Sequence, residues 1–105
     1  MKKYVRDGHV AVVISIDFGA GWSTWSRSPE EQLQKLFDPG IVDYILNKNL
    51  EHLSQYINLK YPSDSAFDPE NLGIHWLPEG TEFFVHEYDG LEKVYIKENV
   101  KWITA

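Results

Sequence analysis

Residues 17–27 carry the side chains in this sequence that are best suited to binding a small molecule. Two glycines in this loop let a ligand approach the main chain closely, and nearby hydroxyl groups offer neutral hydrogen bonds. The indoles of Trp22 and Trp25 offer flat surfaces on which a base or a sugar can stack. The predicted ligand-binding residues are Asp17, Gly19, Ala20, Gly21, Trp22, Ser23, Thr24, Trp25 and Arg27, joined by Arg6 from the N-terminal segment. Together they predict a site for a nucleotide-like ligand of little charge.

The glycines of this loop match no standard phosphate-binding motif. Thr24 stands where the third glycine of a dinucleotide fingerprint belongs, and no Gly-Lys-Ser/Thr follows as in a Walker loop. The alternative interpretation is structural: both tryptophans pack in the core at one end of a sheet, and the glycines serve turn geometry. The residues themselves leave both interpretations open.

Catalytic and metal-binding side chains show no diagnostic spacing. None of the four histidines lies in a His-Glu-x-x-His motif or pairs at the spacing of a zinc ligand set, so we predict no metal, no cofactor and no catalytic residue. His75 and His86 lie in neighbouring expected strands and could meet across the sheet as a structural pair. Asp17 is the best candidate for a ligand-orienting carboxylate, and the alternative is that it caps the amides of its own loop.

One region of the sequence carries an excess of aromatic side chains. Phe83-Phe84-Val85 is apolar on both faces of its expected strand, and Tyr88, Tyr95 and Trp102 extend the aromatic surface. Such a surface usually packs within its own chain, but on a domain this small it also fits a subunit interface. We therefore expect a homo-oligomer.

A hairpin and a central strand are expected to lead into the loop. Asp7-Gly8 is a turn dipeptide between Tyr4-Val5-Arg6 and the run His9–Ile16. Both faces of that run are apolar, so this strand is expected to be central and covered on both sides.

Residues 28–61 carry the spacing and capping signals of helices. Ser28-Pro29-Glu30-Glu31 has the N-cap serine, the N1 proline and the N3 glutamate of a capping box. Asp38 follows the first apolar stripe and is placed to cap a second helix. Asn47-Lys48-Asn49 breaks or bends the path, and Pro62 ends it.

The last third of the chain is rich in strand signals. Turns at 78–80 and 89–90 separate the expected strands, and Val100–Thr104 is expected to form a last strand. The sequence therefore predicts a single α+β domain over residues 1–105, with a mostly antiparallel sheet of five or six strands and two or three helices inserted after the N-terminal hairpin. Residues 17–27 and 62–71 stay irregular, and loops often carry binding sites.

Composition narrows the classes of partner. The chain is 43% apolar and 25% charged, has no cysteine and carries a formal charge of −6. Its 4 Trp, 6 Tyr and 5 Phe exclude a disordered chain, and the missing cysteine excludes a disulfide scaffold. The acidic balance argues against a nucleic acid polymer or an anionic membrane surface as partner. The first apolar run, Val10–Ile16, is too short to span a bilayer, so we expect a cytoplasmic protein.

Several motifs together give the chain a family resemblance. These motifs are Gly19-Ala20-Gly21-Trp22-Ser23-Thr24-Trp25, Leu36-Phe37-Asp38-Pro39, Ile74-His75-Trp76-Leu77-Pro78-Glu79-Gly80-Thr81-Glu82-Phe83 and Glu87-Tyr88-Asp89-Gly90. The chain resembles a family of small hypothetical proteins of tailed phages and prophages, about one hundred residues long. The resemblance implies a host-cell cytoplasmic location and a role in counter-defence, and it transfers no catalytic motif.

Three functions follow as expectations. The first is a sponge that sequesters a nucleotide immune signal, with Trp22 and Trp25 stacking on a base and Arg27 or Arg6 offsetting phosphate charge. The second is an acidic inhibitor that binds a host or defence enzyme through exposed carboxylates. Its candidate residues are Asp64, Asp68, Glu70, Glu79, Glu82, Glu87 and Glu92. The third is a small phosphodiester hydrolase with Asp17, His75 or His86 as acid or base. Asp64, Asp68 and Glu70 lack the glycine and final glutamate of a calcium loop, so a solvated acidic loop is expected there.

Overall fold

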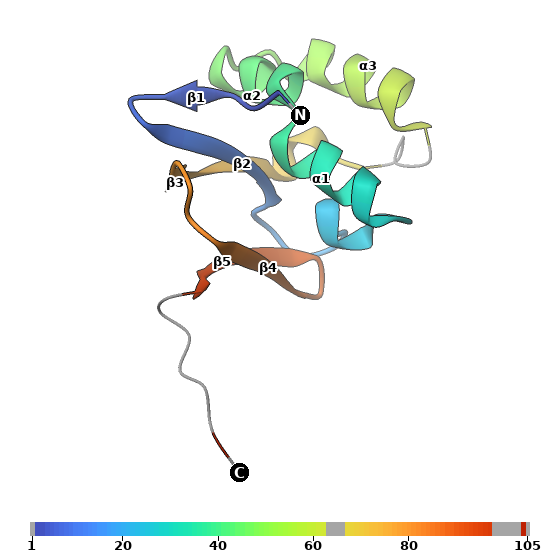
Figure 1. Cartoon of the computed structure of the whole chain (residues 1–105). Helices are drawn as coiled ribbons and strands as arrows, with labels where there is room; N and C mark the ends of the chain where they lie inside the picture. Colours follow the sequence, from blue (N-terminus) through green and yellow to red (C-terminus); the bar gives the residue numbers. More distant parts are fainter. Residues whose placement is uncertain (1, 63–66, 98–103, 105) are drawn as a thin grey trace.

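The computed structural model describes residues 2–62, 67–97 and 104 of the chain (Figure 1). The elements in chain order are β1 (Val5–Arg6), β2 (His9–Ser15), the short 3-10 helix η1 (Ser23–Trp25), α1 (Pro29–Phe37), α2 (Pro39–Leu46), α3 (Leu50–Lys60), the short 3-10 helix η3 (Pro69–Asn71), β3 (Leu72–Pro78), β4 (Phe83–Tyr88) and β5 (Leu91–Ile96). The helical block thus lies between two strand-rich blocks, in the order that the sequence predicts. The expected last strand, Val100–Thr104, falls on residues that are almost all outside the described part.

The strands form two antiparallel sheets. β2 lies between β1 and β3 in a three-stranded sheet, and β4 pairs with β5 in a separate two-stranded sheet. The α+β class with antiparallel strands is confirmed, but its strands divide between two sheets where a single sheet was expected. The physical reason is that β2 is apolar on both faces. The β4–β5 hairpin covers one of these faces with its own apolar side, which it could not do by extending the first sheet at its edge.

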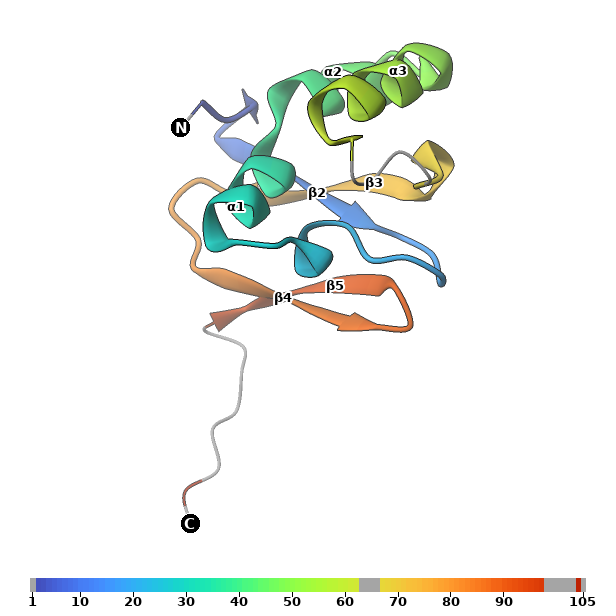
Figure 2. The ribbon, with the colours of Figure 1, turned by 90° about the vertical axis from the view of Figure 1, so that its right-hand side faces the viewer.

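The elements stack in three layers, with the three-stranded sheet in the middle (Figure 2). α2 and α3 cover one face of that sheet, and the β4–β5 hairpin lies on the other side, with α1 beside them. The prediction of a central strand covered on both sides is therefore confirmed. On the helical side the core contains Ala11, Val13, Trp22, Ile41, Val42, Leu53, Ile57, Tyr61 and Leu72. On the hairpin side it contains Val10, Val12, Ile14, Leu36, Phe37 and Leu77, against which Phe83, Val85, Val94 and Ile96 pack.

The helix boundaries follow the capping residues that the sequence shows. The Ser28 hydroxyl accepts the Glu31 N–H at 3.1 Å, and α1 begins with a proline, which needs no hydrogen-bonded N–H there. Asp38 ends α1 and caps α2. The interruption at 47–49 is a real break, because Lys48 adopts a positive φ of 54° and Asn49 caps α3. These starts and stops fix where the loop and the hairpin meet the helices.

Both predicted hairpin turns are present with the expected residues. Asp7 and Gly8 have φ values of 51° and 74°, and Asp89 and Gly90 have φ values of 51° and 88°. Two-residue hairpin turns require positive φ at both positions, which glycine adopts freely and aspartate tolerates. The second turn places β4 and β5 in register from Phe83 to Tyr88 and brings Gly90 against the 17–27 loop.

Candidate functional site

The main-chain amides of the 17–27 loop bind a carboxylate of the protein itself. Glu92 on β5 is only 2% exposed, and one of its oxygens accepts the N–H groups of Trp22 and Thr24, each at 3.0 Å. The same oxygen accepts the Thr24 hydroxyl at 2.6 Å, and the other oxygen accepts the Ser15 N–H at 2.8 Å. The N–H groups of Trp22 and Thr24, with the Thr24 hydroxyl, therefore form an arrangement that binds an anion. The anion that these groups hold is Glu92.

Trp22 belongs to the core. Its side chain is fully buried, and its indole N–H donates to the Lys35 carbonyl at 3.1 Å. Its ring lies edge-on to Tyr61 with centroids 5.5 Å apart, and it also contacts Phe67. The Lys35 ammonium lies 4.7 Å from the indole centroid and 3.3 Å from the Glu31 carboxylate. Trp22 presents no surface to a ligand, so the stacking role expected for it is taken by packing against its own chain.

Trp25 is the exposed tryptophan of the pair. Half of its side chain (51%) is accessible, and its indole N–H donates to Glu87 on β4 at 2.9 Å. Gly21 is needed beneath it, because a Cβ there would lie 2.6 Å from the Trp25 ring. The loop also closes onto the second hairpin turn: the Gly19 N–H donates to the Asp89 carbonyl at 2.6 Å. Gly21 thus serves close packing, and Gly19, with a φ of 124°, serves turn geometry, which agrees with the structural interpretation that the sequence left open.

The other residues expected at the site lie in different surroundings. Arg6 pairs with His9 at the start of β2, whereas the 17–27 loop follows the end of that strand. The Arg6 guanidinium instead lies 5.7 Å from each of the Tyr4 and Trp76 ring centroids. Asp17 accepts the N–H of its own neighbour, Phe18, at 2.8 Å. The remaining members are Arg27, which is exposed, Ala20, whose carbonyl accepts the Ser15 hydroxyl, and Ser23, which is buried.

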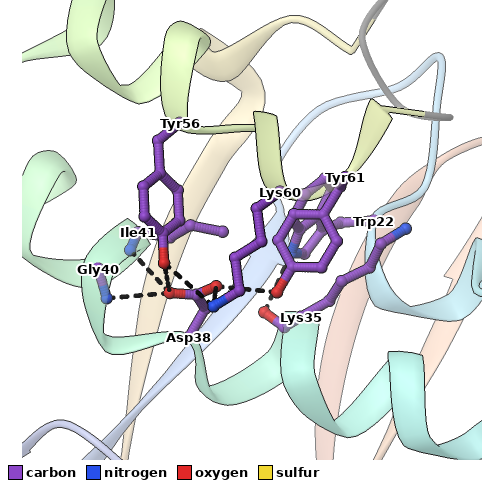
Figure 3. Close-up of polar contacts among 8 residues, drawn as sticks. All are labelled: Trp22, Lys35, Asp38, Gly40, Ile41, Tyr56, Lys60 and Tyr61. Atoms are coloured by element: carbon purple, nitrogen blue, oxygen red, sulfur yellow. Dashed lines mark hydrogen bonds and ion pairs between the residues drawn. The ribbon is translucent and has the colours of Figure 1, made fainter. Parts of the chain in front are cut away.

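A second polar cluster surrounds Asp38 at the junction of α1 and α2 (Figure 3). One oxygen of this buried carboxylate accepts the N–H groups of Gly40 at 2.9 Å and Ile41 at 3.3 Å. The same oxygen accepts the Tyr56 hydroxyl at 2.8 Å. The cap predicted for α2 is therefore confirmed. The additional partners come from α3 and its C-terminal end, which the sequence reasoning missed.

The partners from α3 and its C-terminal end make the Asp38 cluster a polar link between α3 and the junction of α1 and α2. The Lys60 ammonium lies 2.9 Å from Asp38 and 3.1 Å from the Tyr56 hydroxyl, and the buried Tyr61 hydroxyl donates to Asp38 at 2.8 Å. Burial alone would raise the pKa of the Asp38 carboxyl, but the hydrogen bonds from Lys60, Tyr61 and Tyr56 outweigh it and hold that pKa below its usual value. Burial and the Asp38 carboxylate raise the pKa of Tyr61. Both tyrosines stay protonated at neutral pH, because burial and Asp38 also raise the pKa of Tyr56.

The histidines do not assemble into a site. His75 lies on β3 in the first sheet and His86 lies on β4 in the second, so the expected pair across one sheet is wrong. The cause is the division into two sheets. Within residues 2–62, 67–97 and 104, no three histidine, aspartate or glutamate side chains lie where they could hold a metal ion together.

The solvent-facing side of the β4–β5 hairpin carries a group of exposed aromatic rings. We call this surface the hairpin face; its residues are Phe84, His86, Tyr88, Leu91, Lys93 and Tyr95, with Phe18 of the loop beside them. Phe18 and Tyr88 are 58% and 69% exposed. Phe84 and Tyr95 stack with centroids 5.4 Å apart, and His86 meets the Tyr95 ring edge-on. The sequence indicated an aromatic surface here, of which Trp102 lies outside the described residues, but it gave no sign that Phe18 would join it.

The hairpin face contains a hollow of about 300 Å³. Its walls are the rings of Phe18, Tyr88 and Tyr95, and its polar groups are the side chains of His86 and Lys93, which face each other across the two strands. Aromatic rings bind flat molecules by stacking, and a lysine binds anionic groups. The hollow therefore combines aromatic stacking surfaces with a positive charge, the two features that the sequence analysis predicted for the 17–27 loop.

Comparisons with known proteins found no match of any of three kinds. No family model, no curated protein and no solved structure matches the chain. In the part of the chain that the structure describes, no helix is long and apolar enough to cross a membrane.

Proposed function

We propose that this protein binds a small, planar, anionic molecule of the nucleotide type in the hollow of the hairpin face. The observation that carries the proposal is the composition of the hollow: three aromatic rings, a lysine and a histidine on a chain with a net charge of −6. A volume of about 300 Å³ lies at the small end of the range for ligand pockets. It fits a base with its sugar better than a larger cofactor.

The hollow is partly organised before a ligand arrives. The Tyr95 ring contacts the rings of Phe84 and His86. Phe18 belongs to the 17–27 loop, which is held to β5 by the hydrogen bond from the Trp22 N–H to Glu92. Stacking on a fixed ring contributes about 1–3 kcal/mol per base. Lys93 supplies the positive charge for a phosphate. The 17–27 loop would then serve the site by positioning Phe18, and its amides would stay with Glu92.

Isothermal titration calorimetry against a panel of nucleotides tests the proposal. The panel contains purine mononucleotides, cyclic dinucleotides and a cyclic ADP-ribose derivative, which covers the signal class expected from the phage resemblance. We expect binding to at least one member, and we expect Tyr88→Ser and Lys93→Gln each to weaken it about tenfold, the loss of one stacking or ionic contact. Lys48→Gln is the matched control, because it removes the same charge from the far side of the molecule, between α2 and α3.

Three outcomes separate the proposal from its rivals. Absence of heat and of any shift in melting temperature with every member would remove it. Weakening by Trp25→Phe but not by Tyr88→Ser would return the site to the 17–27 loop. Consumption of the ligand, measured by chromatography after heat denaturation of the complex, would favour the hydrolase over a binding protein.

A protein partner is the second candidate function, because the exposed parts of Phe18, Phe84, Tyr88 and Tyr95 form an apolar surface of about 400 Å². Of the acidic residues expected to bind such a partner, Asp64 lies outside the described residues and Glu92 is buried. Three others keep contacts of their own: Asp68 accepts the Glu70 N–H, Glu82 lies 2.9 Å from Lys97, and Glu87 accepts the Trp25 indole N–H. Binding through the rings resists salt, whereas binding through carboxylates fails at high salt. A pull-down at low and at high salt distinguishes the two.

A further inference from the structure

The outer edge of β4 offers unpaired main-chain groups. In a hairpin closed by a two-residue turn, Tyr88 and Leu91 pair through the main chain, and so does every second position before and after them. The N–H and C=O groups of Phe83, Val85 and Glu87 therefore point away from β5. Among the described residues, no main-chain hydrogen bond reaches these groups.

An apolar groove runs beside this edge. It has a volume of about 340 Å³ and lies between α1 and β4; its lining residues are Gln32, Leu33, Leu36, Phe37, Phe83, Phe84 and Val85. Leu33 on α1 is 48% exposed and Phe84 on β4 is 46% exposed. A free strand edge next to an apolar helix surface is the arrangement to which an additional strand binds.

We propose that β4 pairs with β4 of a second copy of this chain, in an antiparallel register centred on Val85, to form a symmetric dimer. This inference does not depend on the proposed ligand. Antiparallel pairing of two identical strands is two-fold symmetric, so each copy offers the surface that the other needs. Centring on Val85 places Phe83 opposite Glu87 of the second copy, and all the outward main-chain groups of these positions find partners.

The sequence of β4 favours pairing with a second copy over an edge strand that stays exposed to solvent. Natural edge strands are protected by proline, charged side chains, bulges, very short length or a covering helix or loop. Phe83–Tyr88 contains neither proline nor lysine and pairs with β5 without a bulge, and its one carboxylate, Glu87, already accepts the Trp25 indole N–H and the Gly90 N–H. The other edge of the hairpin, on β5, is next to β2, and the Glu92 side chain of β5 binds the Ser15 N–H and the Trp22 N–H of the loop. One symmetric contact therefore closes the edge of β4.

The surface area that this contact would bury lies at the lower end of the range for specific dimers. The exposed parts of Leu33, Phe84 and Trp25, with the edge of a six-residue strand, amount to about 500 Å² per copy, or about 1,000 Å² in total. That is the lower limit for a specific interface, so we expect a dissociation constant in the micromolar range. Each copy carries a charge of −6, so salt that screens the repulsion should strengthen the dimer. Association driven by charge pairs would show the opposite dependence.

Sedimentation velocity of the full chain, from low micromolar to several hundred micromolar without ligand, tests the dimer. We expect a monomer–dimer equilibrium that Leu33→Lys and Val85→Pro each weaken at least tenfold. Val85→Pro removes an outward N–H, a position where an edge strand tolerates proline. Leu59→Lys is the matched control, because Leu59 is almost fully exposed on α3, away from the groove.

Amide exchange measured at the two ends of the same concentration range gives the register. The N–H groups of Phe83, Val85 and Glu87 should exchange several-fold more slowly at high concentration, and those of the β1 edge should not change. This readout and Leu33→Lys remain decisive if Val85→Pro does not fold. A monomer throughout the range would overturn the inference. So would a dimer that Leu33→Lys leaves unchanged, or one that protects other amides; in each case the proposed ligand site would be unaffected.

Discussion

Replacing Glu92 by glutamine tests whether a buried carboxylate fastens the 17–27 loop to the hairpin. The carboxylate accepts four hydrogen bonds, from the Ser15 N–H, the Trp22 N–H, and the N–H and hydroxyl of Thr24. Glutamine keeps one accepting oxygen. In its best orientation that oxygen takes the three bonds from Trp22 and Thr24, and the amide NH₂ then faces the Ser15 N–H, donor against donor.

The cost can be estimated from these contacts. An unsatisfied buried N–H costs about 1–3 kcal/mol, and the three remaining bonds lose the strength that a charged acceptor gives. We expect Glu92→Gln to lower the free energy of unfolding by about 3–4 kcal/mol, a large part of the roughly 5–15 kcal/mol of a typical domain. Glu92→Ala leaves every donor unpaired and should cost more.

Urea unfolding followed by circular dichroism measures this loss, and amide exchange at Ser15, Trp22 and Thr24 locates it. Glu79→Gln is the control, because Glu79 is exposed and should change stability by less than about 0.5 kcal/mol. A loss below about 1 kcal/mol for Glu92→Gln, with unchanged exchange at those three amides, would refute the reasoning.

Three further expectations concern the core and the turn. The folded protein holds the Asp38 pKa below its unfolded value, so the unfolded chain binds the proton first as pH falls. Stability should therefore fall as pH drops below about 4. Asp38→Asn should show a flatter dependence of the melting temperature on pH in this range. Trp22→Ala should cost about 3–5 kcal/mol in urea unfolding and Trp25→Ala about 1 kcal/mol, and equal costs would contradict the assignment of one buried and one exposed indole. Gly90→Ala should lower the melting temperature more than Gly8→Ala, because both have positive φ but a Cβ at Gly90 would lie 2.5 Å from the main chain of the loop.

The local structure could be predicted because its signals are local. Ser28 and Asp38 cap helices through amides two or three residues away, and the Asp-Gly turns need only their own backbone angles. The continuous apolar run of β2, which makes both of its faces apolar, correctly indicated a central strand. The division into two sheets was missed, because whether β4 pairs with β3 or packs across the sheet depends on long-range packing that no short pattern records.

The site was harder to predict because its contacts are distant in the chain. The sequence predicted the 17–27 loop as a site for a nucleotide-like ligand, whereas the anion that its Trp22 and Thr24 amides hold is the side chain of Glu92, about seventy positions later. A signal existed: Glu92 is in phase with Val94 and Ile96, which face inward, so a charge at that position needs donors. Nothing local distinguishes Trp22 from Trp25, since their exposure is decided by α1 and β4.

Mapping of nucleotide binding by two-dimensional NMR tests the central claim most directly. A labelled sample is titrated with the tightest-binding member of the calorimetry panel, and amide shifts are followed residue by residue. We expect saturable shifts at Phe18, Tyr88 and Lys93, and small shifts at Trp22 and Thr24, because Glu92 already accepts their amide N–H groups. Shifts confined to residues 19–27, or no saturable shift with any member of the panel, would contradict this expectation.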